Sequence, residues 1–254
     1  MPRELRVDAL PVRVFDDSRA LGVAAGEHAA TAIRDAIAAR GVAHAMFATG
    51  NSQFDFLAAL VRDERVDWTR VVGFHMDEYV GIAADHPASF RRYLRERIVE
   101  QVPIAEFHFI EGDAPDPGTE SARYAVLLRD HALDLCCLGI GENGHLAFND
   151  PPVADFDDPL DVKVVELDEA CRRQQVGEGH FPDVSSVPAH AITVTIPALL
   201  RAATVLAIVP EARKAAPVAR ALRGPVETAC PASVLRRHAH ATLYLDADSA
   251  AALT

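Results

Sequence analysis

The sequence predicts an α/β fold with a largely parallel, Rossmann-like, doubly wound sheet and helices on both faces. The main observation is that short apolar runs of strand length alternate with longer helical patterns almost from end to end. A second is that no Ser/Gly-rich linker, low-complexity tract or internal repeat divides the chain, so residues 1–254 are interpreted as a single domain. A third is that half of the residues are apolar, enough to bury a large core.

The elements follow in order along the chain. Val12–Phe15 is typical of a strand, and Asp17 and Ser18 then cap an Ala-rich helix that runs to about Arg40 and ends at Gly41. The other predicted strands are Ala43–Ala48, Val71–Phe74, Leu133–Gly139, His190–Val194, Val205–Val209 and Ala241–Leu245. The other predicted helices are Phe54–Val61, Ser121–Arg129, Glu211–Leu222 and Ala232–His238.

Composition excludes several classes of protein. The net charge of -12 is spread over the chain and leaves no dense basic stripe, so no nucleic-acid partner is expected. The four cysteines form no CxxC pair and indicate a reducing compartment rather than a disulfide framework. Neither a signal peptide nor a long apolar span is visible, which predicts a cytoplasmic protein without a membrane partner.

Ligands of open parallel sheets bind beyond the carboxyl ends of the strands, so the segments that follow each strand are the candidates for chemistry. The first is Ala48–Gln53, between a strand and a helix. Gly50 permits a tight turn, the helix start offers backbone N–H groups to an anion, and Thr49 and Ser52 add hydroxyl donors beside Asn51. The same residue types also serve as a simple helix cap, and this segment by itself does not separate the two interpretations.

The second segment, Gly73–Tyr79, carries the adjacent carboxylates of Asp77 and Glu78 directly after a buried strand. A partly desolvated carboxylate there acquires a raised pKa and can serve as a general base. The alternative is a solvated loop, or a helix N-terminus that favours acidic residues.

The third segment, residues 139–150, is a Gly-rich loop that follows a predicted central strand. Its glycines let the backbone approach a ligand closely, and its histidine titrates near neutral pH. An Asn and an Asp flank this histidine, and either could hold the imidazole in one tautomer. This pattern favours a functional histidine over a structural one. The residues concerned are Gly141, Asn143, Gly144, His145 and Asp150.

Two weaker features lie nearer the C-terminus. In Pro210–Ala215, Lys214 or Arg213 could reach back as a cation for a phosphate, although a solvated helix face explains them equally simply. His238 and His240 are interpreted as surface histidines, because no carboxylate or cysteine accompanies them. No metal site is therefore predicted.

Taken together, these segments resemble the glucosamine-6-phosphate deaminase/isomerase family, which is related to the 6-phosphogluconolactonases. The order and spacing of the matches extend over most of the chain. The lactonases share the Gly-rich loop and its histidine but lack the Met-Asp-Glu-Tyr segment and the Ala-Phe-Asn continuation. The matching segments are Thr49–Gln53, Phe74–Tyr79, Gly139–Asn149, Ala191–Val194, the Lys214–Ala215 pair and the Ser233, Leu235 and His238 ending.

The resemblance implies an aldose–ketose isomerisation of an amino sugar 6-phosphate with loss of ammonia, without a metal or an organic cofactor. It implies that Asp77 moves a proton between C2 and C1, that His145 assists ring opening, and that Asp150 is the acidic partner of His145. Lys214 and the backbone of Thr49–Gln53 would bind the phosphate. The residues assigned to catalysis are Asp77, Asn143, His145 and Asp150, and those assigned to substrate or phosphate binding are Thr49, Gly50, Asn51, Ser52, Glu78, Gly141, Gly144 and Lys214.

Several positions depart from the family pattern. Asn143 stands in place of an Asp, so it supplies no charge to an imidazolium, and Asp150 stands in place of a Glu and is expected to have a shorter reach towards His145. Gln175 falls where the family has a phosphate-binding Arg, although Arg172 and Arg173 are close in sequence. The loop at Thr49–Gln53 also differs from the family pattern. The sequence therefore does not determine which sugar is the substrate.

Two other functions fit the same residues. A lactonase acting on a phosphorylated sugar acid would use His145 as the base that activates water and would not need Asp77. A non-catalytic sugar-phosphate sensor would keep the pocket without turnover. In each case the partner is a small sugar phosphate, and assembly into a homo-oligomer stays open.

Overall fold

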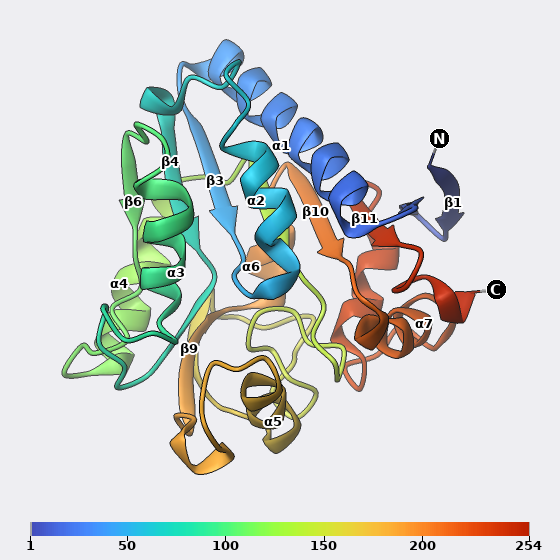
Figure 1. Cartoon of the computed structure of the whole chain (residues 1–254). Coiled ribbons are helices and arrows are strands. Elements are labelled where there is room, and N and C mark those ends of the chain that lie inside the picture. The colour runs from blue at the N-terminus through green and yellow to red at the C-terminus, as the bar shows by residue number, and fades with distance from the viewer. Residues whose placement is uncertain (1, 254) are drawn as a thin grey trace.

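The computed structural model describes residues 2–253 and has an eight-stranded sheet at its centre (Figure 1). The strands are Arg3–Val7 (β1), Leu10–Phe15 (β2), Ala43–Phe47 (β3), Val71–His75 (β4), Glu106–His108 (β6), Leu135–Leu138 (β7), Thr204–Val209 (β10) and Ala241–Asp246 (β11). Their order is β1-β2-β11-β10-β7-β3-β4-β6. Every neighbouring pair is parallel except β1 and β2, which pair antiparallel at one edge. The predicted α/β class with a largely parallel sheet is confirmed.

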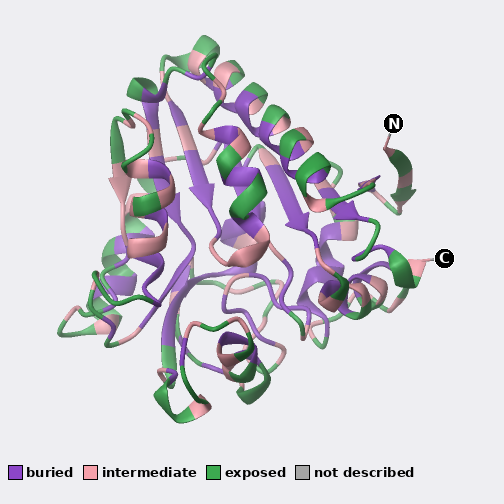
Figure 2. Ribbon diagram, in the orientation of Figure 1, coloured by how far each residue is buried: buried purple, intermediate pink, exposed green. Residues whose placement is uncertain are grey.

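Helices cover both faces of this sheet because successive strand residues point in opposite directions. In β7, Leu135 and Cys137 pack into the apolar cluster that includes the first two α-helices, whereas Cys136 and Leu138 belong to the cluster on the opposite face. Figure 2 shows the central strands as buried. The helices are Ser18–Arg40 (α1) and Phe54–Leu60 (α2) on one face, and Pro117–Asp130 (α4), Ile196–Leu200 (α6) and Ala215–Arg223 (α7) on the other.

The long helix α1 begins and ends where the sequence predicts. The side chain of Asp17 accepts a hydrogen bond from the backbone N–H of Ala20, which satisfies one of the free donors of the first turn. Gly41 has φ 82° and donates its N–H to the carbonyl of Ile37. This left-handed conformation is favourable for glycine, so it ends the helix at this position.

A second, three-stranded sheet lies beyond the carboxyl ends of β3 and β10 (Figure 1). Its strands are Asp77–Tyr79 (β5), Val162–Glu166 (β8) and His190–Val194 (β9), all antiparallel, and the helix Glu169–Gly177 (α5) follows β8. The prediction that His190–Val194 belongs to the parallel sheet is therefore wrong. An apolar run indicates a buried strand, but it does not say which partner the strand takes.

Other differences concern short or irregular elements. The predicted helix at residues 232–238 is a 3₁₀ segment, Pro231–Arg237, and the predicted helix at residues 211–222 opens with a 3₁₀ turn before α7. The strand β1 was not predicted, because its side chains are exposed or half-buried at the edge of the sheet and form no apolar run. The remaining segments are Asn51–Gln53 (η1), Trp68–Arg70 (η2), Phe90–Leu94 (α3), the π-helical Arg95–Val99 (η3), Val184–Ser186 (η4), Ala212–Lys214 (η5), Pro231–Arg237 (η6) and Ala251–Leu253 (η7). Among residues 2–253, no helix has the length and apolar character needed to cross a membrane.

The strand order reverses between β3 and β7. From β3 the chain adds β4 and β6 on one side, and it then returns to place β7, β10 and β11 on the other side. The loops after β3 and β7 therefore diverge and leave a crevice at their carboxyl ends. In open α/β sheets this switch point is where ligands bind.

Candidate active site

A pocket opens at this switch point and brings together segments that are far apart in sequence. The loops after β3 and β7, the start of β5 and the end of α5 all contribute to its walls. The polar side chains and glycines that line it include Thr49, Gly50, Asn51, Ser52, Asp77, Gly141, His145, Gln174, Gln175, Glu178, His180 and Lys214.

The loop after β3 is held in place by its own contacts with neighbouring elements. Gly50 has φ 97°, a conformation that favours glycine, and its carbonyl accepts a hydrogen bond from the hydroxyl of Tyr93 at 2.8 Å. The Gln53 side chain donates to the carbonyl of Ile208 in β10 at 3.2 Å, and the Ser52 hydroxyl donates to Glu211. The loop is thus fixed with its backbone facing the pocket, as an anion site requires.

Lys214 is the buried cation of this pocket. It is the last residue of η5 and is 4% exposed. Burial lowers the pKa of its ammonium group, although the charge of Glu178 acts in the opposite direction. The neighbouring Arg213 turns away from this role and forms ion pairs with Glu178 and Glu211, both at 2.7 Å.

An anion, Glu178, also lines the pocket. Burial by itself would raise its pKa, but the hydrogen bond with His180 and the charges of Arg213 and Lys214 lower it to about 2. Its carboxylate is therefore ionised at any working pH. His180 lies 3.3 Å from Glu178 and lines the same pocket.

Asp77 begins β5 and lies at the mouth of β4, where the sequence predicts a general base. It pairs with Thr193 of β9, which fixes the strand, and its side chain lines the pocket although the residue is only 7% exposed. Burial, followed by the nearby charge of Glu78, raises the pKa of Asp77 well above its ordinary value. A carboxylate with a raised pKa is a stronger proton acceptor in its ionised form.

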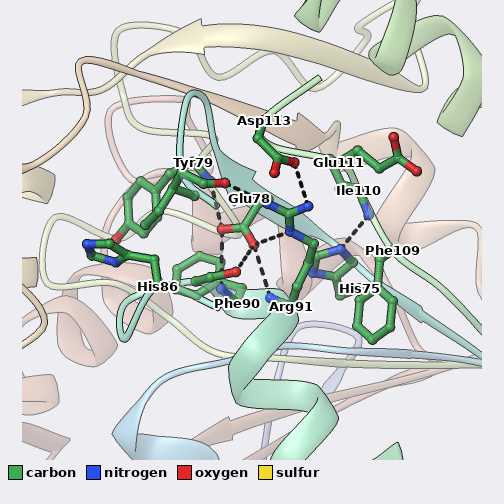
Figure 3. Close-up of polar contacts among 12 residues, drawn as sticks. His75, Glu78, Tyr79, His86, Phe90, Arg91, Phe109, Ile110, Glu111 and Asp113 are labelled. Carbon is green, nitrogen blue, oxygen red and sulfur yellow. Dashed lines mark hydrogen bonds and ion pairs between the residues drawn. The ribbon is translucent and has the colours of Figure 1, made fainter. Parts of the chain in front are cut away.

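Glu78 is not among the residues that line this pocket. Its carboxylate faces Arg91 and the start of α3 instead (Figure 3). Adjacent residues of a strand point to opposite sides, so when Asp77 faces the pocket Glu78 faces the protein interior. Its carboxylate accepts hydrogen bonds from the Ser89 hydroxyl at 2.7 Å and from the backbone N–H of Arg91 at 3.0 Å. The Arg91 guanidinium lies 3.4 Å away and bridges to Asp113. Glu78 therefore anchors the start of α3.

His145 lines the pocket, and its ring is held by Asp150. Its Nδ1 is 2.8 Å from Oδ1 of Asp150, so the shorter side chain of Asp150 reaches the ring directly, contrary to the sequence-based expectation. Burial would raise the pKa of Asp150, but the His145 charge and the hydrogen bonds from His145 and Asn143 lower it. The carboxylate is therefore kept ionised beside the ring.

Asn143 acts through Asp150 rather than on the imidazole. Its side-chain amide donates to Asp150 Oδ1 at 2.8 Å, and its own oxygen accepts the backbone N–H of His145 at 3.0 Å. Neither Asn143 nor Asp150 lines the pocket. Asp150 contacts the ring directly, and Asn143 contacts Asp150.

Gly141 and Gly144 of this loop are glycines for different structural reasons. A Cβ on Gly141 would lie 2.1 Å from Nε2 of His145, so a side chain there would collide with the ring at the pocket wall. Gly144 does not line the pocket. It has φ 93°, and a Cβ there would lie 2.8 Å from the sulfur of Cys230, so the turn favours glycine.

The arginines considered near Gln175 do not enter the pocket. Arg172 donates to backbone carbonyls of residues 184 and 187, and Arg173 forms an exposed ion pair with Glu169. Gln175 does line the pocket, and its side-chain oxygen accepts a hydrogen bond from the Tyr79 hydroxyl at 2.7 Å. No arginine is therefore found among the pocket-lining residues of the described chain.

Comparison with known proteins agrees with this architecture. Residues 16–244 match the family described as glucosamine-6-phosphate isomerases/6-phosphogluconolactonase. The chain belongs to this family. The match includes every strand from β3 to β10 and therefore all the loops that form the pocket.

Similar members of the family carry the name glucosamine-6-phosphate deaminase. The protein of Exiguobacterium sp. (strain AT1b) is 36% identical over 193 residues, which cover 75% of this chain and 73% of that protein. The protein of Listeria innocua is 35% identical over 206 residues, covering 81% and 86%. A solved monomeric glucosamine-6-phosphate deaminase superimposes with a TM-score of 0.85 at 28% identity, covering 95% of this chain and 99% of that chain. A 6-phosphogluconolactonase of Shewanella baltica shares the fold, with a TM-score of 0.77 at 19% identity over 92% of this chain and 97% of that chain.

Sequence reasoning missed three polar side chains in the pocket of this family member, Gln174, Glu178 and His180. They come from the end of α5 and the segment after it. This region does not directly follow a strand, so the search of strand ends did not include it. The Gln174 side chain accepts the backbone N–H of Glu142 at 2.9 Å and donates to Glu178 at 2.8 Å, which ties α5 to the Gly-rich loop. The Glu–Gly–His run at residues 178–180 is the feature of the sequence that could have indicated these pocket residues.

The histidines at the C-terminal end take no part in this pocket. The His240 ring contacts the carbonyl of Leu200 at 3.0 Å and packs edge-on against His238. Within residues 2–253, a single set of side chains places three possible metal ligands together, namely His145, Asp150 and Cys171.

Proposed function

We propose that this protein is a glucosamine-6-phosphate deaminase, which converts glucosamine 6-phosphate into a ketose 6-phosphate with release of ammonia. The single observation that carries the proposal is that Asp77 and His145 face one pocket that also holds Lys214. The reaction needs a base, a proton donor and an anion site around one sugar. The named relatives in the same family support the choice of reaction.

The proton transfer is assigned to Asp77. In the open-chain amino sugar, a base removes the proton from C2 and returns a proton to C1, so the aldose becomes a ketose and the amino group at C2 leaves as ammonia after water adds. A buried carboxylate with a raised pKa is suited to both steps, because it accepts a proton more readily than a solvated carboxylate does.

Ring opening is assigned to His145, with Asp150 and Asn143 as its positioning residues. Because Nδ1 lies against Asp150, the other ring nitrogen, at the pocket wall beside Gly141, is the one that meets the sugar. It would take the proton of the C1 hydroxyl and give a proton to the ring oxygen, so that the C1–O bond breaks and the aldehyde forms. Asp150 stabilises the imidazolium without exchanging the proton itself.

The phosphate is assigned to Lys214 and the backbone of the loop at residues 49–53, with His180 as a second cation when protonated. The pocket uses loops of the large sheet and a strand of the small one, so we propose that residues 1–254 work as one domain. We also propose a cytoplasmic location and a small sugar phosphate as the partner. The proposal does not specify whether the protein forms a homo-oligomer.

The test is ammonia release from purified protein over a panel of 2-amino-sugar 6-phosphates, with hydrolysis of a 6-phosphosugar lactone measured in parallel. We expect ammonia from glucosamine 6-phosphate and none from Asp77→Asn. Lactone hydrolysis that survives Asp77→Asn, without ammonia release by the wild type, would assign the pocket to the lactonase reaction instead.

A further inference from the structure

Three side chains of different chemistry meet on the side of His145 that faces away from the pocket centre. His145 Nδ1, a carboxylate oxygen of Asp150 and the sulfur of Cys171 lie within 4.8 Å of one another. All three residues are buried. Cys171 comes from the first turn of α5, so this meeting depends on how α5 packs against the Gly-rich loop.

The group has unused capacity for a ligand. Asp150 is fully buried, yet its Oδ2 has no hydrogen-bond partner, because its contacts are made through Oδ1. His145 Nδ1 lies 2.8 Å from Oδ1 of the same carboxylate, so the imidazole can share a cation with it. A buried carboxylate oxygen without a partner is costly, and a cation would satisfy it.

The donor set selects the kind of cation. Imidazole nitrogen, carboxylate oxygen and thiolate sulfur are the three ligand types of zinc sites, and a separation of a few ångströms between donors suits a tetrahedral ion. A thiolate excludes Mg²⁺ and Ca²⁺, which take oxygen ligands. Three protein ligands leave the fourth position for water.

We propose that His145, Asp150 and Cys171 form a binding site for a thiophilic divalent cation such as Zn²⁺, and that occupation of this site inhibits the enzyme. The cation replaces the proton of the Cys171 thiol, which is released to solvent. It bonds to the thiolate, to the carboxylate and to Nδ1 of the neutral imidazole tautomer, whose proton has moved from Nδ1 to Nε2.

Inhibition follows from what the cation does to His145. A metal on Nδ1 withdraws electrons from the ring and separates it from Asp150, so the other nitrogen no longer gains and loses a proton during ring opening. This part rests on the proposed function. The binding of the cation does not, because it depends only on the three side chains.

The experiment uses the purified full-length chain after treatment with EDTA. Cd²⁺ is added first, because a cadmium–thiolate bond produces an ultraviolet charge-transfer band that reports sulfur coordination directly. Zn²⁺ affinity is then measured by competition with a chromophoric chelator, and ammonia release is measured at each Zn²⁺ concentration. We expect one thiolate-bound cation per chain and loss of activity with the same concentration dependence.

Cys171→Ser is the decisive variant and Cys230→Ser its matched control. Cys230 is another buried free cysteine beside the same loop, where it packs against Gly144, but it lies outside the three-residue group. Cys171→Ser should lose the charge-transfer band and bind Zn²⁺ at least ~10-fold more weakly, whereas Cys230→Ser should match the wild type. Asp150→Asn should also weaken Zn²⁺ binding, which keeps the test decisive if Cys171→Ser does not fold.

Equal Zn²⁺ affinity in Cys171→Ser and the wild type, or no thiolate band with Cd²⁺, would overturn the site. Activation by Zn²⁺ would overturn the inhibitory role. If the cation binds through Cys171 but the wild type releases no ammonia from any amino sugar phosphate, the site stands and the proposed function fails. If the cation binds through Cys171 but ammonia release is normal and unaffected by Zn²⁺, the site and the proposed function stand and the inhibitory role fails.

Discussion

Oδ1 of Asp150 lies 2.8 Å from Nδ1 of His145 and is held there by a second contact from behind. The amide of Asn143 donates to the same oxygen at 2.8 Å. The Asn therefore sets the position of the carboxylate, and the carboxylate sets the position of the ring. These three residues belong to one loop and depend on one another's contacts. We therefore expect a substitution at any of them to change the pH dependence of turnover.

The first prediction concerns Asn143→Ala. The hydrogen bond from Asn143 helps to lower the pKa of Asp150, so its loss should raise that pKa. The proposed mechanism requires ionised Asp150, and the acid limb of the pH–rate profile should therefore move to higher pH. Steady-state kinetics across the acid range would check this. An unchanged acid limb would mean that the Asn143 contact does not tune Asp150.

A second prediction separates the base from its neighbour. Asp77→Asn should fold normally and lose turnover by at least ~10²-fold, the usual contribution of a positioned general base, with binding of the sugar phosphate largely retained. Turnover and substrate affinity should be measured separately, the latter by calorimetry on the inactive variant. Near-wild-type kcat in Asp77→Asn would remove Asp77 from the mechanism.

The adjacent change, Glu78→Gln, should act mainly on stability. Glu78 accepts several hydrogen bonds from the start of α3 and faces the Arg91 guanidinium, so the variant should unfold more easily by about 1–3 kcal/mol. The charge of Glu78 also helps to raise the pKa of Asp77, and its removal should move the acid limb due to Asp77 to lower pH. Urea unfolding and the pH–rate profile test the two effects. An unchanged unfolding midpoint would contradict the anchoring role.

The fourth prediction concerns the anion in the phosphate pocket. Glu178 has a pKa of about 2 and is ionised throughout the working range, so it repels a bound phosphate at every practical pH. Glu178→Gln should lower KM by roughly 5-fold, which corresponds to about 1 kcal/mol of repulsion in a partly screened site. Competitive inhibition by inorganic phosphate should strengthen in parallel. Weaker phosphate binding in Glu178→Gln would show that its contact with Arg213 and His180 matters more than the repulsion.

A fifth prediction is that ammonia release survives EDTA, because the proposed steps use only side-chain acids and bases. Chelation should restore activity to protein inhibited by Zn²⁺. Activity lost on chelation and recovered with zinc or manganese would contradict metal-independent catalysis.

The fold class and the position of the catalytic edge followed from local sequence alone. Alternating strand and helix patterns are short-range signals, and parallel strands joined by helices place their carboxyl ends at one edge. The segments around Asp77 and His145 could therefore be predicted to meet, and the structure places both in one pocket. The cap of α1 at Asp17 and its end at Gly41 were equally local.

What only the tertiary structure decided was the orientation of individual side chains and the contribution of α5. The sequence shows two adjacent carboxylates, but pairing of β5 with β9 turns Asp77 towards the pocket and Glu78 towards the interior of the protein. Glu178 and Cys171 reach the site because α5 packs against the Gly-rich loop, where Gln174 accepts the backbone N–H of Glu142, 32 residues earlier in the chain. Local patterns determine which element forms, whereas long-range packing determines which of its faces meets another element, and no periodicity within a single segment contains that information.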